Sequence, residues 1–518
     1  MSAPAAGGPA AGEGPGRRDA APAPRHLYIH VPFCAARCDY CEFYSVPVGR
    51  AGETGVGPAA GAAHEHQASA ASEPADRERL LDRFVAALGE EWRRERERFD
   101  VRGLETVFIG GGSPSLLGWE RLERLLEPFE ALLTARAEIT VETNPDDVTP
   151  AFAAWAAARR VRVSLGVQSF DARLREALGR RAAADPEAAF ATLRNAGVGA
   201  LQPPDRPGAA VPTAVASAAP VARVPYRPGA PGLGVDLIFG LPGQGLVDIE
   251  AELATVARLR PDHVSWYELG IVPGSALADR VTPGDDARLG REVAELSDGA
   301  RFGFETAAPS GAARSASGAA EPFGEAGRLG HEPETQSVAD GARSDREAST
   351  LPDDDAMAAM YRRVVAGLGE LGLDWYEVSN FARPGYRCCH NSAVWRGCDY
   401  LGLGPGAVGT VGGRRQRDLP DLHAYLAALE GGAAPPRSHE ALDDATRARE
   451  RLLLAARTGE RVPLDELGGV IDQSALAPLA AAGLVSLAGG TLRVTRKGRY
   501  VANGVCVRLF RDSSFLEA

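Results

Sequence analysis

The sequence has no apolar run that approaches the length of a membrane span, which argues against an integral membrane protein. It also lacks a hydrophobic stretch at its start: residues 1–24 are rich in Ala, Gly and Pro, so we expect a solvated tail and no secretory signal. Positive net charge is missing too, because 57 basic residues stand against 69 acidic ones, a net charge of −12. This balance argues against nonspecific binding to nucleic acid or to anionic membranes. We therefore expect a cytoplasmic protein, and 518 residues suffice for two domains.

Three internal stretches are poor in the apolar side chains that build a core. Residues 49–76 are rich in Gly, Ala, Glu and Ser, residues 203–233 in Pro and Ala, and residues 305–350 in Gly, Ala, Ser and charged residues. Such segments bury too little surface to offset the entropy that is lost on ordering. We interpret them as surface insertions or linkers.

Between these stretches, short β-prone runs alternate with amphipathic helical patterns. Strand, helix and strand at this spacing are typical of a parallel α/β sheet, whose functional residues gather at the carboxyl ends of the strands. The expected strands are residues 27–31, 106–109, 138–142, 162–167, 235–239, 263–269 and 375–378, and the expected helices are residues 75–98, 119–134 and 171–178.

The pattern changes near Leu419. Helical periodicity over residues 422–429, 446–456 and 474–484 is followed by a basic, β-prone run at 491–499. This order predicts a small helical, winged-helix-like domain, and we read Arg496–Arg499 as a turn at the wing because the chain is acidic. The predicted organisation is a tail (1–24), a first domain (25–415) that contains the insertions, and a C-terminal domain (416–518).

The chain has seven cysteines, and three of them lie within eight residues: Cys34, Cys38 and Cys41. They follow the β-prone run Leu27–Val31, which ends at Pro32, so they lie on a loop just past a strand. A loop of this length can curl three sulfurs around one small object. Three thiolates can hold three corners of a [4Fe–4S] cluster, which leaves the fourth iron open to another ligand.

Zinc and disulfide interpretations explain this motif less well. A closed zinc site needs four ligands, usually as two spaced pairs, and no second Cys/His pair with such spacing is nearby. His30 could complete a site only if it pointed from its strand into the loop. A disulfide would leave one thiol over, and nothing in the sequence suggests an oxidising compartment.

The spacing Cys-x3-Cys-x-Tyr-Cys resembles the signature of the radical S-adenosylmethionine (SAM) enzymes. The preceding string Tyr-Ile-His-Val-Pro-Phe-Cys, residues 28–34, is similar to the branch that contains oxygen-independent coproporphyrinogen III oxidase and the HemW heme chaperones. The oxidase carries a further cysteine where this chain has Phe43, and the ending Cys-Glu-Phe-Tyr-Ser has the HemW form. The resemblance runs in blocks from about Arg25 to about Phe510. It implies a partial (β/α)6 barrel, a [4Fe–4S] cluster on the three cysteines, and SAM bound at the open iron.

Further residues match positions that contact SAM in this family. A Gly-Gly-Gly-Ser turn follows one strand and lets the backbone approach a ligand, although such a sequence is most often only a turn. Glu142 and Gln168 end the next two strands, and Asp236 lies in an apolar strand, where a carboxylate is costly without a partner. Arg180 can pair with a carboxylate in bidentate fashion, whereas a lone Arg is more often a solvated charge. By resemblance, the SAM contacts are Tyr28, Tyr40, Gly111, Gly112, Ser113, Glu142, Gln168, Arg180, Asp236, Gly270 and Val408.

A block ahead of Trp395 bears on the subgroup. HemW-like proteins carry His-Asn-x-x-Tyr-Trp here, tied to heme-related function, and this chain reads His390-Asn-Ser-Ala-Val394-Trp. Imidazole and thiolate both bind heme iron, so His390 and Cys388 are candidate heme ligands. An isolated histidine is more often structural, and adjacent cysteines can be soft core residues.

Three functions remain open from the sequence. The favoured one is a cytoplasmic chaperone that binds the cluster, SAM and heme and passes heme to respiratory enzymes, with no catalytic residue assigned. The second is the decarboxylating coproporphyrinogen III oxidase, against which Phe43 counts. The third is another radical SAM enzyme, such as a methyltransferase or cyclopropanase. It stays open because the chain replaces an expected Tyr or His by Val394, Val408 and Ala182.

The expected partners are heme, respiratory heme enzymes as clients, and flavodoxin or ferredoxin if SAM is cleaved. We expect no nucleic acid, and membrane association only through the clients.

Overall fold

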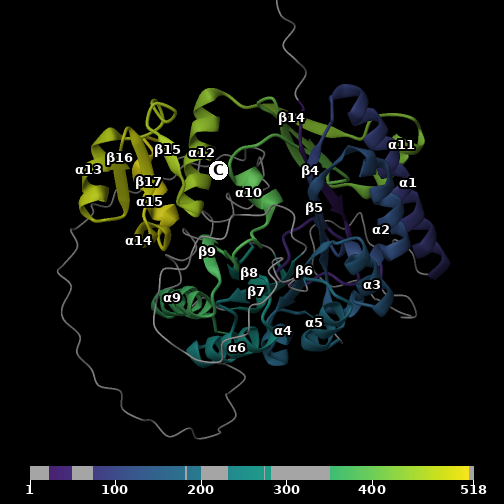
Figure 1. Cartoon of the computed structure of the whole chain (residues 1–518), viewed down its shortest axis with the longest axis horizontal. Helices are drawn as coiled ribbons and strands as arrows, with labels where there is room; N and C mark the ends of the chain where they lie inside the picture. Colours follow the sequence, from purple (N-terminus) through teal and green to yellow (C-terminus); the bar gives the residue numbers. More distant parts are fainter. Residues whose placement is uncertain are drawn as a thin grey trace, which may run out of the picture.

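One mixed sheet organises most of the computed structural model, which describes residues 23–49, 74–180, 184–199, 232–272, 275–281 and 350–512 (Figure 1). Its twelve strands run in the order β14-β13-β12-β11-β1-β4-β5-β6-β7-β8-β10-β9. The strands from β11 to β8 in this order are parallel, and antiparallel strands extend both edges. The bounds are β1 (His26–Val31), β4 (Leu104–Gly111), β5 (Leu133–Thr143), β6 (Arg162–Gln168), β7 (Leu233–Phe239), β8 (His263–Glu268), β9 (Asp374–Glu377), β10 (Asn380–Ala382), β11 (Tyr400–Leu403), β12 (Val408–Val411), β13 (Arg414–Asp418) and β14 (Arg437–Ala441).

Helices cover the outer side of this curved sheet (Figure 1). Each strand from β4 to β7 is joined to the next through helical segments, which is the βαβ connection that parallel strands require. The helices of this body are α1 (Pro74–Arg98), α2 (Trp119–Leu126), α3 (Pro150–Ala158), α4 (Ala172–Ala177), α5 (Pro186–Asn195), α6 (Leu246–Leu259), α7 (Ala276–Arg280), α9 (Asp354–Glu370), α10 (Cys389–Trp395) and α11 (Leu422–Glu430).

The two faces of the parallel strands differ in polarity. Because successive side chains of a strand point to opposite faces, Leu27, Ile29 and Val31 of β1 enter the core beneath the helices, while His26 and His30 face the concave side. The other parallel strands follow the same alternation. The concave side is therefore lined by polar groups: His26, Tyr28, His30, Thr106, Glu138, Thr140, Glu142, Arg162, Ser164, Gln168, Asp236, His263, Ser265 and Tyr267. This side can hold a polar ligand.

The expected strands all overlap observed ones, but two predicted elements differ from the structure. The predicted helix 119–134 is wrong in its second half: α2 ends at Leu126, a 3-10 segment covers Glu127–Leu132, and β5 begins at Leu133. Pro128, which has no N–H to donate, lies where the helix ends. The expected strand at 375–378 exists as β9, yet it is antiparallel to β10 at the sheet edge.

The predicted insertions lie almost entirely outside the described residues. Four of their ends do not: Gly49 and Thr350 are described, residues 74–76 begin α1, and Gly232 precedes Leu233, where β7 begins. The predicted tail likewise lies outside, apart from residues 23 and 24.

The C-terminal part has a hydrophobic core of its own, with Leu452, Val462, Ile471, Leu492 and Leu509 among its members. It consists of α12 (Asp444–Thr458), α13 (Gln473–Ala481), α14 (Arg496–Arg499), α15 (Ala502–Leu509) and a sheet of order β15-β17-β16, with β15 (Arg461–Pro463), β16 (Val485–Ala488) and β17 (Thr491–Val494). The antiparallel β16 and β17 form the expected wing.

The C-terminal part, the second body, begins later than the predicted residue 416, because its first element is α12. α11 packs Leu422, Tyr425 and Leu426 into the core of the first body, and β13 and β14 extend its sheet. Periodicity shows that residues 422–429 form an amphipathic helix, but it does not show which core receives the apolar face.

The basic run Arg496–Arg499 is a helical turn, α14, and contacts the first body. The guanidinium of Arg499 lies 3.8 Å from the ring centre of Trp375 in β9 and donates to the carbonyl oxygen of Trp375 at 3.2 Å. Arg457 of α12 pairs with the buried Glu377 at 2.7 Å. These cations therefore hold the two bodies together. Within the described residues, no helix is long and apolar enough to cross a membrane.

Candidate cofactor site

The cysteine loop leaves the carboxyl end of β1 and is closed at its base by a pair of two-residue strands. β2 (Phe33–Cys34) pairs in parallel with β3 (Val46–Pro47). The amide of Val46 donates to the carbonyl of Pro32 at 2.6 Å, and that of Val48 donates to the carbonyl of Cys34 at 2.9 Å. Cys34, Cys38 and Cys41 all have free thiols. The loop thus gathers three thiols at the end of the barrel where ligands of parallel sheets bind.

The three thiols lie close enough to influence one another. Burial and the neighbouring thiols Cys41 and Cys38 raise the pKa of Cys34 to about 12. Burial and Cys38 likewise raise the pKa of Cys41 to about 11. Metal coordination removes such protons, since iron binds the thiolate. Across the described ranges, no group of three His, Cys, Asp or Glu side chains is placed to hold a single metal ion.

Arg180 brings a partly buried positive charge to this loop. Its Nη1 lies 3.7 Å from Cys38 Sγ, and its Nη2 donates to the carbonyl of Gly166 at 2.6 Å and to Asn144. The Nε atom is buried without a partner among the described residues. Burial raises the pKa of the neighbouring Tyr40 phenol, and the cation of Arg180 opposes that rise. An unsatisfied guanidinium N–H beside the thiols is available to an anionic ligand group.

Two carboxylates, Glu142 and Asp236, face the concave side next to each other. Burial, followed by the charge of Asp236, raises the pKa of Glu142 to about 8, and the bond from the amide of Gly111 at 3.1 Å opposes this. Burial also raises the pKa of Asp236, which accepts bonds from the Ser164 hydroxyl at 2.9 and 3.0 Å. In the described part of the chain, neither forms an ion pair. Two partly buried carboxylates that form no ion pair make a natural site for a cation or a pair of hydroxyls.

Gln168 ends β6 in a strained conformation. Its φ of +68° is unusual for a residue other than glycine, and the β6–β7 register shifts here. Such strain persists where the surroundings enforce it, most often at functional sites. Here Glu252 of α6 accepts from the hydroxyl of Ser169 and, at 3.0 Å, from the amide of Phe170. Arg175 donates to the carbonyls of both residues, at 2.8 and 2.9 Å.

Replacing Glu252 by alanine is expected to release this turn. The change leaves the buried Ser169 hydroxyl and Phe170 amide without their acceptor, so the free energy of unfolding falls by about 2–4 kcal/mol. Glu252→Gln keeps an acceptor and costs about half as much. Urea denaturation followed by circular dichroism measures both. Equal stability of the alanine variant and the wild type would contradict this role.

The other predicted SAM contacts lie in different surroundings. Gly111 lies against the His30 ring, where a Cβ atom would come within 2.6 Å, and Gly112 packs on the Phe33 backbone, so both positions need glycine. Ser113, by contrast, donates its hydroxyl to Asp147 at 2.5 Å. The Tyr28 hydroxyl lies 3.0 Å from His30 Nδ1 on the concave side. Gly270 follows β8, and the half-buried Val408 begins β12.

The candidate heme ligands lie at the opposite end of the barrel, near the amino ends of β4 and β5. His390 is buried, and its Nδ1 lies 2.8 Å from the Thr106 hydroxyl. Burial and His26 lower its pKa to about 3. The thiol of Cys388 is buried 3.5 Å from a Glu138 oxygen, which also accepts from the amides of Cys389 and His390 at the start of α10. Heme ligation by either residue stays a prediction.

Several residues that shape the site were not predicted. Asn144 and Gly166 fix Arg180, Ser164 holds Asp236, and Glu252 supports the Gln168 turn. Ser164 and Gly166 alternate with the apolar residues of β6, and this alternation could have indicated that they face the site. The sequence around Glu252, which lies on a helix, contains no such pattern.

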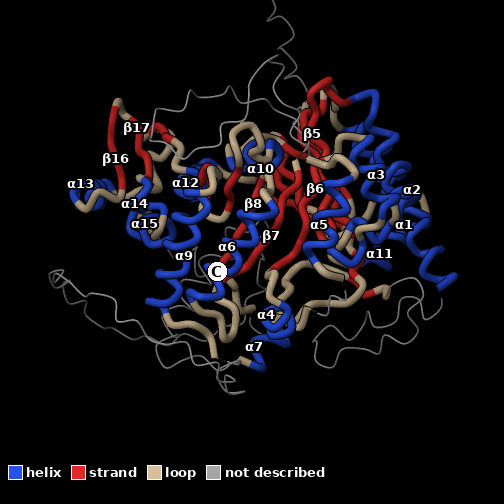
Figure 2. Tube along the Cα trace, turned by 60° about the horizontal axis from the view of Figure 1, so that its bottom comes forward, coloured by secondary structure: helices blue, strands red, loops and turns tan. Residues whose placement is uncertain are grey.

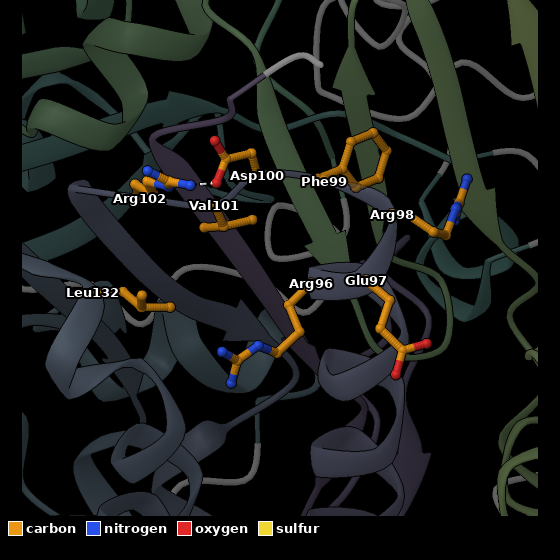
Figure 3. A pocket seen from close by; sticks show the side chains of 8 residues that line it. All are labelled: Arg96, Glu97, Arg98, Phe99, Asp100, Val101, Arg102 and Leu132. Carbon is orange, nitrogen blue, oxygen red and sulfur yellow. Dashed lines mark hydrogen bonds and ion pairs between the residues drawn. The ribbon is translucent and has the colours of Figure 1, made fainter. Parts of the chain in front are cut away.

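A shallow surface hollow elsewhere contains none of the predicted site residues. It lies at the end of α1 and is lined by residues 96–102 and by Leu132, which precedes β5 (Figure 3). Arg102 and Asp100, which form an ion pair, are among these residues.

Comparisons with known proteins agree with this geometry. A family model of the radical SAM superfamily matches residues 28–201. The heme chaperone HemW of Mycobacterium tuberculosis H37Rv is 30% identical over 485 residues, which cover 93% of this chain and 94% of that protein. The chain belongs to the HemW family of radical SAM proteins. HemW of Escherichia coli K12 is 27% identical over 391 residues, covering 75% of this chain and 70% of the relative.

A solved structure supports the fold assignment of this HemW-type chain. The coproporphyrinogen III oxidase HemN of Escherichia coli aligns with a TM-score of 0.60 at 19% identity, covering 95% of this chain and 91% of that one. The resemblance inferred from the cysteine motif and the α/β partial barrel are both confirmed.

Membership of the radical SAM family implies a [4Fe–4S] cluster and SAM, and the residues present fit both groups. Three free thiols on one loop suit a cluster. The unsatisfied Nε of Arg180 suits a carboxylate, and the partly buried carboxylates Glu142 and Asp236 suit an ammonium or a ribose diol.

Proposed function

We propose that this protein is a cytoplasmic heme chaperone that binds heme and passes it to respiratory heme enzymes. The observation that carries the proposal is the similarity to the Mycobacterium tuberculosis heme chaperone along nearly the whole of both chains. Phe43 supports it as well, because the oxidase-type cysteine is missing at that position and the side chain is half exposed.

Cys34, Cys38 and Cys41 would hold the cluster, which supplies one-electron redox chemistry and one open coordination position when it is bound. Arg180 places positive charge beside Cys38 and would pair with the carboxylate of SAM. Glu142 and Asp236 would hold ammonium and hydroxyl groups, and Gln168 would add an amide. These residues bind and orient the ligand. An electron donor such as flavodoxin or ferredoxin would be needed only if SAM is cleaved.

We propose that heme, the cargo, binds at the segment around α10, with His390 as its ligand. His390 lies in α10, and its side chain is buried and hydrogen-bonded to Thr106 of β4, so ligation requires this helix to move away from β4. Cys388 is tied to Glu138 in the same way. We therefore expect slow heme uptake, limited by the opening of this segment.

One set of assays on anaerobically reconstituted protein tests the function. Heme titration, SAM cleavage and turnover of coproporphyrinogen III are measured in parallel on the wild type, His390→Ala and His423→Ala. The exposed His423 is the matched control. Tight heme binding that only His390→Ala weakens, without decarboxylation, supports the proposal. Porphyrinogen turnover without heme binding would instead identify an oxidase.

A further inference from the structure

The tip of the cysteine loop contacts α7, the short helix that follows β8. The amide of Leu277 donates to the carbonyl of Asp39 at 3.0 Å. The guanidinium of Arg280 pairs with the Asp39 carboxylate, Nη2 to Oδ2, at 2.6 Å. Asp39 directly follows Cys38, so α7 holds the backbone next to a predicted cluster ligand.

The same Arg280 connects the loop to α4. Its Nη2 also donates to the carbonyl of Ala177 at 3.1 Å, and α4 and α7 lie side by side (Figure 2). Gly179, just after α4, has φ +67°, and a side chain there would collide with the Asp39 carboxylate. Three segments that are distant in the sequence therefore meet at Asp39.

An apolar cluster lies beneath these polar contacts, separate from the main core. Tyr40 packs against it, and Leu277, which is 1% exposed, is a member. The remaining buried members come from α4, β7 and the segments that follow α4, β7, β8 and α7: Leu174, Leu178, Ile238, Leu241, Leu269 and Val281. Both residues between Cys38 and Cys41 are thus anchored, Asp39 by polar contacts and Tyr40 by apolar ones.

We propose that α7 is a clasp that positions the tip of the cysteine loop, with Leu277 and Arg280 as its positioning residues. The inference rests on the proposed cluster site and deepens it. The clasp fixes Cys38 and Cys41 at the geometry that the cluster requires and restricts access of solvent and small reagents to them. β2 and β3 secure only the base of the loop, so the tip depends on Arg180 and on the clasp.

Two variants open the clasp to different degrees. Arg280→Gln removes a partly exposed ion pair, so the tip should open about twofold to fivefold more often. Leu277→Ala removes a buried contact, so opening should increase at least about tenfold. Arg280→Lys keeps the charge and should stay within about twofold of the wild type. Arg102→Gln, which removes another surface ion pair, is the matched control.

The first measurement uses the apo protein and needs no cofactor. Iodoacetamide labelling of Cys38 and Cys41 is followed by peptide mass spectrometry, with the exposed Cys398 as internal reference. The second measures the rate at which a chelator removes iron from the reconstituted protein. Faster rates in Arg280→Gln and Leu277→Ala, with Arg280→Lys and Arg102→Gln close to the wild type, support the clasp. Unchanged rates in both opening variants, or an Arg280→Lys rate as fast as that of Arg280→Gln, would overturn it.

The two measurements also separate this inference from the proposed function. If the wild type assembles no cluster, the proposed site fails, while the labelling rates still report on the clasp. If the cluster forms normally and neither rate responds to the variants, the clasp fails and the proposed site stands.

Discussion

Replacing Cys38 by alanine is expected to abolish the iron–sulfur absorbance of the reconstituted protein and, with it, measurable SAM binding. Two thiolates on one loop leave two corners of a four-iron cluster without protein ligands, where the wild type leaves one. The Cys38 thiol also lies 3.7 Å from the Arg180 guanidinium. Iron content, visible absorbance and low-temperature electron paramagnetic resonance of dithionite-reduced samples measure the effect.

Cys398→Ala is the control for this experiment, since Cys398 is exposed and lies outside the loop. It should retain full iron content. A Cys38→Ala protein that keeps a normal four-iron spectrum would refute the ligand assignment. Zinc in place of iron in the anaerobically purified wild type would refute it as well.

Glu142→Gln is expected to weaken SAM binding and to stabilise the protein without ligand. A charge-assisted hydrogen bond is worth about 1.5–3 kcal/mol, so SAM affinity should fall about 10- to 100-fold. The same change removes a carboxyl whose ionised form is disfavoured by burial and by the charge of Asp236. Calorimetric titration and urea denaturation measure the two effects, whose opposite signs distinguish a ligand-binding carboxylate from a merely structural one.

The pH dependence follows from the raised pKa of Glu142, about 8 against an ordinary value of 4.5. The folded state binds this proton more tightly than the unfolded state does. The stabilising contribution is therefore complete below about pH 4.5 and is lost as pH rises through 8, a total of about 3–5 kcal/mol. SAM affinity should move the other way, rising up to about tenfold per pH unit toward pH 8, because the ionised carboxylate binds the cation. In Glu142→Gln both dependences should flatten. Glu105→Gln, at a partly exposed position on β4, is the control and should leave the affinity unchanged.

Much of the candidate site could be proposed from the sequence because it depends on local patterns. The spacing of Cys34, Cys38 and Cys41 limits what the loop can hold, and Glu142 and Gln168 stand where strands end. Asp236 was conspicuous because a carboxylate interrupts an apolar strand. Each of these signals lies within a window of a few residues.

What the sequence did not reveal depends on contacts between distant segments. The approach of Arg180 to Cys38 and of Arg280 to Asp39 joins parts of the chain that share no pattern. The burial of His390 depends on where α10 packs. Which hydrophobic core α11 packs into depends on the arrangement of the whole sheet. Amphipathicity shows that a surface will be covered, but it does not show by which partner.

The position of β1 between β4 and β11 has a consequence for how the protein is made. β1, the first of the described strands along the chain, gains one neighbour early, but its other neighbour, β11, begins only at Tyr400. Pairings across so many residues form slowly, and sheet edges that wait for partners invite wrong associations. The cysteine loop follows β1 directly, so we expect its final geometry, and with it iron binding, only after β11 has been synthesised.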